Sequence, residues 1–321
     1  YGLAATGNST HGYFGGGRFP TTAQMDKVTY ASDTTAAVPG ANLITGRSFL
    51  AATGNSTAGY FGGGFDPGPN FYSTMDKVTY STDTTAAVTG AALSVAREQL
   101  AASSNSANGL PDPNTIPETF DNKFIDNSKS YDTGYFGGGS LPGGTAQMDK
   151  TTYASDTTAA VPGANLTVAR YALAATGNSE AGYFGGGAPS PYSRVDKTTY
   201  ASDTIAAVPG ANLTVARYAL AATGNSTHGY FGGGIPTTAQ MDKVTYSSDT
   251  TAAVPGANLT VERYRLAATG NSTHGYFGGG APSGALMDKV TYASDTTAAV
   301  PGANLSAARY GLAATGNSTH G

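Results

Sequence analysis

The chain has no cysteine and no tryptophan, and only 12% of its 321 residues are charged. Without cysteine it forms no disulfide, and it offers no thiolate for zinc, iron–sulfur or nucleophilic chemistry. This absence leaves the compartment open, because a protein without disulfides is compatible with the cytosol or the exterior. Since tryptophan is missing and alanine dominates the apolar residues, tyrosine and phenylalanine must supply most of the buried area.

Charge and long apolar runs are also scarce. The 17 basic and 21 acidic side chains give a formal net charge of -4, with no basic cluster that could follow a phosphate backbone. No apolar run approaches the roughly 18 residues of a membrane helix, and no signal peptide is visible. We therefore expect neither nucleic acid as a partner nor insertion into a membrane. The first residue is Tyr1 and not methionine, which indicates a processed or partial piece.

One repeat fills the sequence instead. The string G-Y-F-G-G-G occurs six times, each time followed by a D-K-[VT]-T-Y segment, a V-[PT]-G-A turn and an L-A-A-[TS] segment. A period of about 47 residues predicts one supersecondary unit that must stack on its neighbours to bury its apolar face. The period favours a ring or an array over a two-layer domain.

Each unit reads as four short antiparallel strands. In the fourth unit these are Leu173–Asn178, Gly182–Phe184, Asp196–Tyr200 and Ala206–Arg217. Gly177 and Asn178 tolerate left-handed backbone angles and are predicted to close the first hairpin. The fourth segment contains V-P-G-A, whose proline suits an outer edge strand.

The alternation of the third strand assigns its side chains to two faces. Lys197 and Thr199 should share one face, and Asp196, Thr198 and Tyr200 the other. Four-stranded sheets repeated around an axis are the blades of a β-propeller. The predicted fold class is therefore all-β, a β-propeller.

The repeat resembles the kelch type, in which an arginine precedes the first strand, an aromatic second strand ends in Gly-Gly and the third strand has a tyrosine. The matching residues of the fourth unit are Arg170, Phe184, Gly185, Gly186 and Tyr200. Kelch blades usually have a tryptophan about seven residues after this tyrosine, where this chain has alanine, as at Ala37 and Ala253. The resemblance implies four-stranded propeller blades.

A second resemblance is closer at the level of the amino-acid sequence. Strings such as L-T-V-A-R-x-x-L-A-A, N-S-T-x-G-x-F-G-G-G and D-x-V-T-x-A-S are similar to kelch-like repeats in virion proteins of phages of marine bacteria. The similarity spans nearly every unit apart from the insertion near residue 120. It implies a location on a virion or an extracellular surface, and other virion or surface proteins as partners.

Six complete blades are predicted, at about 3–46, 50–97, 100–170, 173–217, 220–263 and 266–309. Residues 310–321 repeat residues 1–12 letter for letter, and they are predicted as an additional first strand. A seven-bladed ring whose last blade is cut short is the alternative.

The segments between G-G-G and D-K vary while the rest of the repeat stays nearly constant. All six connect a second to a third strand, so they should gather on one face of the propeller, where recognition is usually built. Aromatic side chains beside a charge suit a sugar or a protein surface. The candidate ligand-binding residues are Arg18, Phe19, Phe65, Asp66, Phe71, Tyr72, Tyr192 and Arg194. Neutral variation of these loops, with aromatics that cap the blade ends, is the alternative interpretation.

The third unit contains an insertion at about 105–132, which should emerge on the opposite face and contact a neighbouring subunit. Its acidic residues offer oxygen ligands for calcium, foremost Asp112, Asp121 and Asp126, with Glu118, Asp132, Asn122 and Asn127 nearby. Their spacing matches no EF-hand loop, so a solvated acidic loop is the preferred interpretation.

Three further residue types recur with the repeat. Four histidines lie in S-T-H-G turns (His11, His228, His274 and His320), where the second and fourth units have Ala58 and Ala181, and they are interpreted as surface residues. Every unit also has one arginine and one D-K aspartate. Because an active site breaks symmetry, these are predicted to form internal scaffold pairs.

The residues favour a structural or adhesive propeller over an enzyme, with no cofactor. Galactose-oxidase-type copper chemistry needs a cysteine, and glycoside hydrolysis needs two carboxylates that face each other. Asp66 is the only acidic residue of the variable loops. We expect adhesion to a host glycan or receptor protein, with a pure assembly module without ligand as the alternative and a carbohydrate-active enzyme as the least favoured option.

Overall fold

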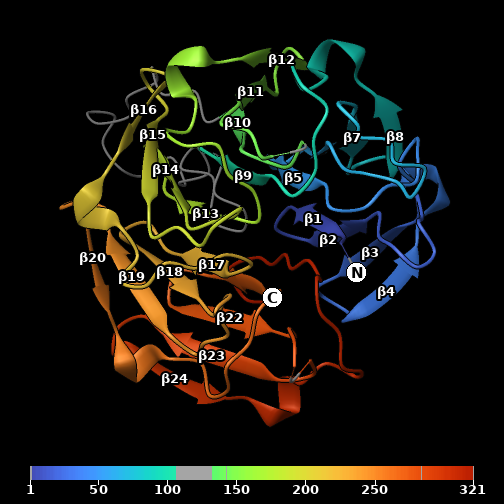
Figure 1. Cartoon of the computed structure of the whole chain (residues 1–321). Coiled ribbons are helices and arrows are strands. Elements are labelled where there is room, and N and C mark those ends of the chain that lie inside the picture. Colours follow the sequence, from blue (N-terminus) through green and yellow to red (C-terminus); the bar gives the residue numbers. More distant parts are fainter. Residues whose placement is uncertain (1, 106–131, 142, 283, 321) are drawn as a thin grey trace, which may run out of the picture.

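The computed structural model describes residues 2–105, 132–141, 143–282 and 284–320, and β-strands dominate its regular structure. Six four-stranded antiparallel sheets stand around a common axis as the blades of a β-propeller (Figure 1). The predicted fold class and the six complete blades are confirmed. None of the helices in these ranges has the length and hydropathy of a membrane span.

The blades follow one another along the chain, and the strands of each sheet lie in chain order. The first three blades are β1 (Ala4–Gly7), β2 (His11–Gly15), β3 (Met25–Thr29), β4 (Thr34–Ala37); β5 (Ala51–Gly54), β6 (Ala58–Gly62), β7 (Met75–Thr79), β8 (Thr84–Ala87); and β9 (Ala101–Ser104), β10 (Thr133–Gly137), β11 (Met148–Thr152), β12 (Thr157–Ala160). The last three are β13 (Ala174–Gly177), β14 (Ala181–Gly185), β15 (Val195–Thr199), β16 (Thr204–Ala207); β17 (Ala221–Gly224), β18 (His228–Gly232), β19 (Met241–Thr245), β20 (Thr250–Ala253); and β21 (Ala267–Gly270), β22 (His274–Gly278), β23 (Met287–Thr291), β24 (Thr296–Ala299).

The fourth strand lies earlier than predicted. In the fourth blade it is β16, and Pro209–Ala211 then form the short 3-10 helix η5 where the sequence predicted an edge strand through V-P-G-A. That prediction was wrong because proline fixes φ and lacks an N–H, which suits the first position of a helical turn better than a ladder. The same turn follows the other fourth strands, as η1 (Pro39–Ala41), η2 (Thr89–Ala91), η4 (Pro162–Ala164), η6 (Pro255–Ala257) and η7 (Pro301–Ala303).

The first hairpin of each blade closes differently from the prediction. The described residues with positive φ do not include Gly177 or Asn178. Instead, the Asn178 side-chain oxygen accepts hydrogen bonds from the backbone N–H groups of Glu180 and Ala181, at 2.9 and 3.0 Å. The asparagine thus closes the turn through its side chain, so left-handed angles are not needed.

The G-Y-F-G-G-G strands of the second to fifth blades each join their blade to both neighbours. Successive side chains of a strand point to opposite faces. Tyr183 therefore stacks on Tyr246 of the fifth blade, with ring centroids 4.8 Å apart, while Phe184 belongs to the core shared with the third blade. Five such cores lie between consecutive blades from the first to the sixth.

The triple glycine serves two purposes. Gly185 lies under a ring of the next blade, and a Cβ there would be 2.7 Å from Phe231. Gly186 and Gly187 have φ values of 72° and 121°, which side chains rarely adopt, and they turn the chain into the variable loop.

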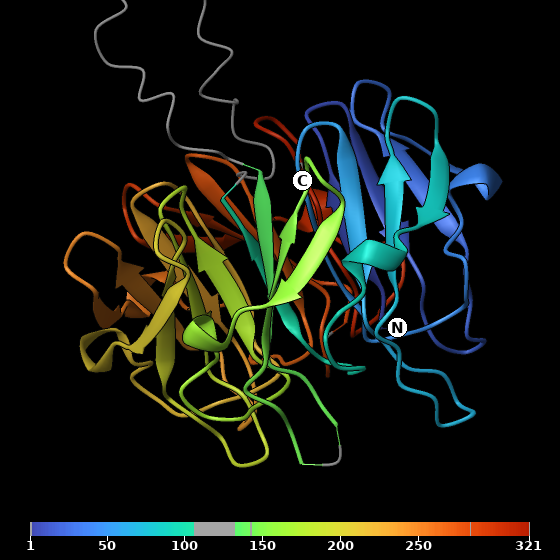
Figure 2. The same cartoon turned by 90° about the horizontal axis from the view of Figure 1, so that it is seen from above.

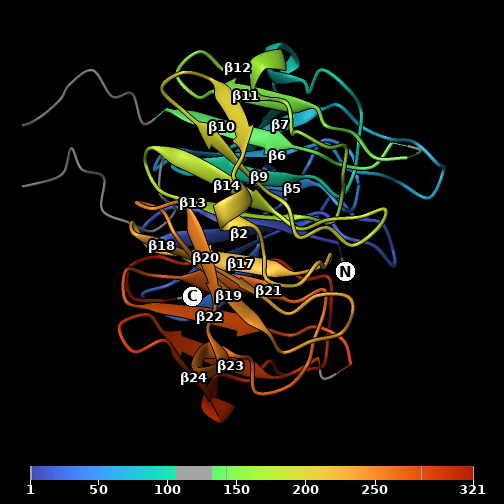
Figure 3. The same cartoon turned by 60° about the vertical axis from the view of Figure 1, so that its left-hand side comes forward.

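The variable loops share one face of the propeller, as predicted (Figures 2 and 3). The turns between first and second strands lie on the other face, together with the ends of β9 and β10 that flank the insertion. Residues 310–320 pass between the sixth and the first blade (Figure 1). The described part of this segment takes a first-strand position but has no β-ladder, since no second strand lies beside it.

Candidate functional site

Four of the candidate residues form one cluster on the loop face, at the junction of the first two blades. The guanidinium carbon of Arg18 lies 5.0 Å from the ring centroid of Phe19 and 5.6 Å from that of Phe65. The Phe65 and Phe71 rings lie 5.6 Å apart. We call Arg18, Phe19, Phe65 and Phe71 the arginine–phenylalanine cluster. Phe19 is 72% exposed, so the cluster presents a cation and an aromatic ring to the outside.

The long loop of the second blade holds two of these rings in place. Phe65 exchanges two backbone hydrogen bonds of 2.9 Å with Ser48 in the connection from the first blade. A carboxylate oxygen of Asp66 accepts a hydrogen bond of 2.6 Å from the Tyr72 hydroxyl, and the other accepts one of 2.8 Å from the Gly68 N–H. Hydrogen bonds from Tyr72 and then Asn70 lower the pKa of Asp66 to about 2. Asp66 and Tyr72 therefore stabilise the loop.

Tyr192 and Arg194 lie apart from this cluster, on the fourth blade. The Arg194 guanidinium donates a hydrogen bond of 2.9 Å to the Thr167 hydroxyl, and its carbonyl accepts one of 2.7 Å from Arg170. The backbone of Tyr192 bonds to Gly187 and Arg217. The eight predicted residues thus share a face but form two groups.

Sequence reasoning missed a set of tyrosines beside the same loops. Tyr171, Tyr218 and Tyr264 form isolated backbone bridges to Ala188, Ile235 and Ala281, which begin the variable loops of the last three blades. All three are partly exposed. The sequence held a signal for these tyrosines, because the position directly after the arginine of each repeat varies. It is occupied by Ser48, Glu98, Tyr171, Tyr218, Tyr264 and Tyr310.

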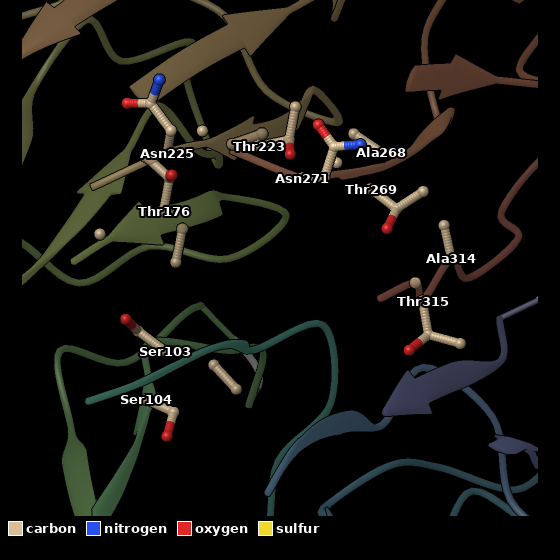
Figure 4. A pocket seen from close by; sticks show the side chains of 17 residues that line it. Ser103, Ser104, Thr176, Thr223, Asn225, Ala268, Thr269, Asn271, Ala314 and Thr315 are labelled. Carbon is tan, nitrogen blue, oxygen red and sulfur yellow. The ribbon is translucent and has the colours of Figure 1, made fainter. Parts of the chain in front are cut away.

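A pocket lies between the first strands of the third to sixth blades and residues 314–316 (Figure 4). Its described lining consists of alanine, glycine, serine, threonine and asparagine, among them Ser103, Thr176, Thr223, Asn225 and Thr269. These side chains offer hydroxyl and amide groups but no titratable group. The pocket can hold water or a small neutral molecule, and its described lining contains no acid–base pair.

The predicted arginine–aspartate pairs form between consecutive blades. Five pairs have N–O distances of 2.6–3.0 Å and side chains at most 1% exposed: Arg47–Asp76, Arg97–Asp149, Arg170–Asp196, Arg217–Asp242 and Arg263–Asp288. Burial lowers the pKa of each arginine, while its aspartate opposes that shift. The prediction of a sixth pair was wrong, since Arg309 is exposed and Asp26 accepts its side-chain hydrogen bond from Gln24.

A lysine and an aspartate add a second polar contact at each of these junctions. Lys77 bonds to both carboxylate oxygens of Asp156 at 2.7 Å, and the Tyr60 hydroxyl donates to the same carboxylate at 2.5 Å. The equivalent lysines Lys27, Lys150, Lys197 and Lys243 meet Asp83, Asp203, Asp249 and Asp295. The sequence analysis missed these aspartates, because each belongs to the next repeat.

Neither histidines nor acidic residues gather into a metal site among the described residues. His11, His228, His274 and His320 each contact the threonine directly before them in the same turn, at 2.8–2.9 Å. The calcium candidates Asp112, Asp121 and Asp126 lie outside the described residues, as do Glu118, Asn122 and Asn127.

The loop face is the part of the described structure that differs most between blades. It combines the arginine–phenylalanine cluster with partly exposed tyrosines, and these are side chains that bind sugars or proteins. No protein-family model and no curated protein matches this chain.

Proposed function

We propose that the chain is a non-enzymatic binding module of a virion or an extracellular surface, and that its loop face contacts a glycan or a protein of the host. The observation that carries the proposal is the arginine–phenylalanine cluster, in which a largely exposed Phe19 stands beside Arg18. An exposed large aromatic side chain has a cost in water, which a ligand removes by covering it.

The distribution of charges supports binding over catalysis. The aspartates of the second to sixth blades are buried against arginines or bonded to lysines, and the Asp66 carboxylate accepts hydrogen bonds within its own loop. The described loop face therefore has no pair of carboxylates free to act on a substrate. A carbohydrate-active enzyme is the less favoured function for this reason.

The test is a glycan array probed with the whole chain and with Phe19→Ala and Arg18→Ala. Both variants should lose at least about tenfold in binding, the usual loss when an interface anchor is truncated. Ile235→Ala is the matched control, because Ile235 begins the corresponding loop of the fifth blade, away from the cluster. Equal binding by all three variants would contradict the proposed site.

The assembly alternative is separated by hydrogen exchange on the native assembly. Free loops at 18–24 and 65–75 support binding of a host ligand. Protection of these loops by a neighbouring chain, together with an empty glycan array, would mean that the propeller is a building block without ligand.

A further inference from the structure

A closed ring of backbone hydrogen bonds surrounds the axis, and it has seven members although the chain has six complete blades. Each member donates its N–H to the carbonyl of the member before it, at 2.5–3.1 Å. All seven residues have φ between 52° and 79°. In chain order they are Gly2, Phe49, Gln99, Ala172, Ala219, Arg265 and Gly311. Six members introduce a complete blade, and the seventh introduces residues 312–320.

The C-terminal copy occupies the place of a first strand before the first blade. A Cβ on Gly12 would lie 2.4 Å from Thr315 Cγ2, as one on Gly59 would lie 2.5 Å from Thr6 Cγ2. In the turn that follows, the Asn317 side-chain amide donates a hydrogen bond of 2.6 Å to the Ser9 carbonyl of the first blade. The Asn271 amide of the sixth blade donates an equivalent bond of 3.2 Å to the Ser318 carbonyl. The segment thus stands in the ring at the same spacing as the first strands of the six complete blades. Among the described residues, no second, third or fourth strand lies outward of it.

We call the place between the sixth and the first blade, outward of residues 312–320, the seam. The two blades that flank the seam expose the side chains that form the buried core at the other five junctions between blades. On the sixth blade, Ala303 is exposed and Leu305 partly so, whereas their equivalents in the other blades are at most 4% exposed. On the first blade, Phe14 and Val28 are partly exposed, whereas Phe61 and Val78 of the second are fully buried. These side chains are the two interface halves that pair in the five complete cores.

The charged side chains at the seam are opposite in sign to the charged side chains that one further repeat unit would place beside them. On the sixth blade Lys289 and Arg309 lack the aspartate partners of their equivalents among the described residues, and on the first blade Asp26 and Asp33 lack the arginine and the lysine. Each D-K-[VT]-T-Y-x-x-D unit with its following arginine brings all four missing partners. A unit of another composition would leave these charges unpaired.

We propose that the seam between the sixth and the first blade is a docking site for one further unit of this repeat, whose second strand pairs with residues 313–316 and whose third and fourth strands extend that sheet outward to complete a seventh blade. Its G-Y-F-G-G-G strand forms the ladder with 313–316, its aspartates meet Lys289 and Arg309, and its lysine and arginine meet Asp33 and Asp26.

The test extends the chain after Gly321 with a copy of residues 230–263, which continues the sequence as it continues in the other units. Docking should raise the melting temperature by about 5 °C or more, because the appended strands bury the two exposed interface halves and pair the charges of the seam. The appended strands should also resist hydrogen exchange. A matched control carries Asp249→Ala and Arg263→Ala within the appended copy.

Asp26→Ala distinguishes docking from unspecific stabilisation. It should lower the melting temperature of the extended chain several times more than that of the original chain, because only the extended chain supplies the arginine. Fast exchange of the appended residues, or an equal effect of Asp26→Ala in both chains, would overturn the proposal.

A second measurement does not depend on folding of the fusion. The separate peptide 228–263, titrated into the original chain by calorimetry, should bind the original at least tenfold more tightly than a variant with both Asp26→Ala and Asp33→Ala. No binding to the original, or equal binding to both, would also contradict the seam as the docking site.

Discussion

Single residues stabilise the junctions between blades through buried charge. Arg170 bonds to Asp196 and to the Phe184 carbonyl, so one guanidinium ties the connection from the third blade to two strands of the fourth. An ion pair in this setting is costly to break, because the remaining partner stays buried without a counter-charge.

Asp196→Ala should therefore lower the free energy of unfolding by about 3–5 kcal/mol, as measured by urea denaturation. Asp26→Ala is the matched control in the first blade, where the aspartate is only partly buried and has no arginine among the described residues. Its effect should stay within about 1 kcal/mol. Equal losses in the two variants would show that the arginine is irrelevant to the effect.

These pairs were predictable because the same two residue types recur in every unit. The lysine–aspartate contacts were not, although their residues recur just as regularly. Lys77 finds Asp156 only because the β11–β12 turn of the third blade reaches over the second, and Asp156 holds a positive φ of 52° in that turn. Such a contact between repeats depends on how the blades stack.

At the scale of the element, the G-Y-F-G-G-G strand decides how closely the blades approach. The first residue of its triple glycine faces the phenylalanine of the following blade at five junctions, as Gly185 faces Phe231. In the sixth blade, the described atoms within reach of a Cβ on Gly278 are the flexible end of Met287. The same position of the repeat therefore faces a packed phenylalanine ring in the fourth blade and a flexible methionine end in the sixth.

Gly185→Ala should lower the free energy of unfolding by about 1–3 kcal/mol, because the new methyl group meets a packed ring that cannot move away. Gly278→Ala should change it by no more than about 0.5 kcal/mol, since the methionine end can turn aside. The comparison uses urea denaturation of both variants. A larger loss for Gly278→Ala than for Gly185→Ala would contradict this packing argument.

The whole molecule is held together by contacts between blades, and some of them depend on pH. Burial raises the pKa of Asp156, but hydrogen bonds from Lys77 and Tyr60 outweigh burial and leave it below the ordinary value. The pKa values of Asp83 and Asp295 are lowered in the same way. A folded-state pKa below that of the unfolded chain contributes stability that is complete above the unfolded pKa and is lost as the pH falls through the folded one.

We therefore expect the melting temperature to decline below about pH 4, the ordinary pKa of aspartate. Asp156→Asn should lower the melting temperature at pH 7 and flatten this decline. Asp33→Asn is the control, since Asp33 of the first blade meets no lysine among the described residues. A decline of the same depth in Asp156→Asn would contradict the linkage.

The sequence alone determined the blade fold and the six complete blades. A 47-residue repeat of short strands with alternating faces can bury its aromatic residues only by packing them against the neighbouring repeats. The sequence also determined which face bears the variable loops, since strand order places them all at the same end. Tertiary structure alone decided which loop residues meet. Arg18 reaches Phe65 because the first two blades are adjacent, while Tyr192 is held on the fourth blade.

Only the tertiary structure decided how the ring closes. Residues 310–321 are identical in sequence to 1–12, so the sequence predicts the same strand in both places. The first copy forms β1, whereas the described residues of the second copy form no ladder. The physical reason is that a β-strand is made by its partner. β2 follows the first copy, while the described C-terminal residues lie between the sixth and the first blade without a second strand beside them.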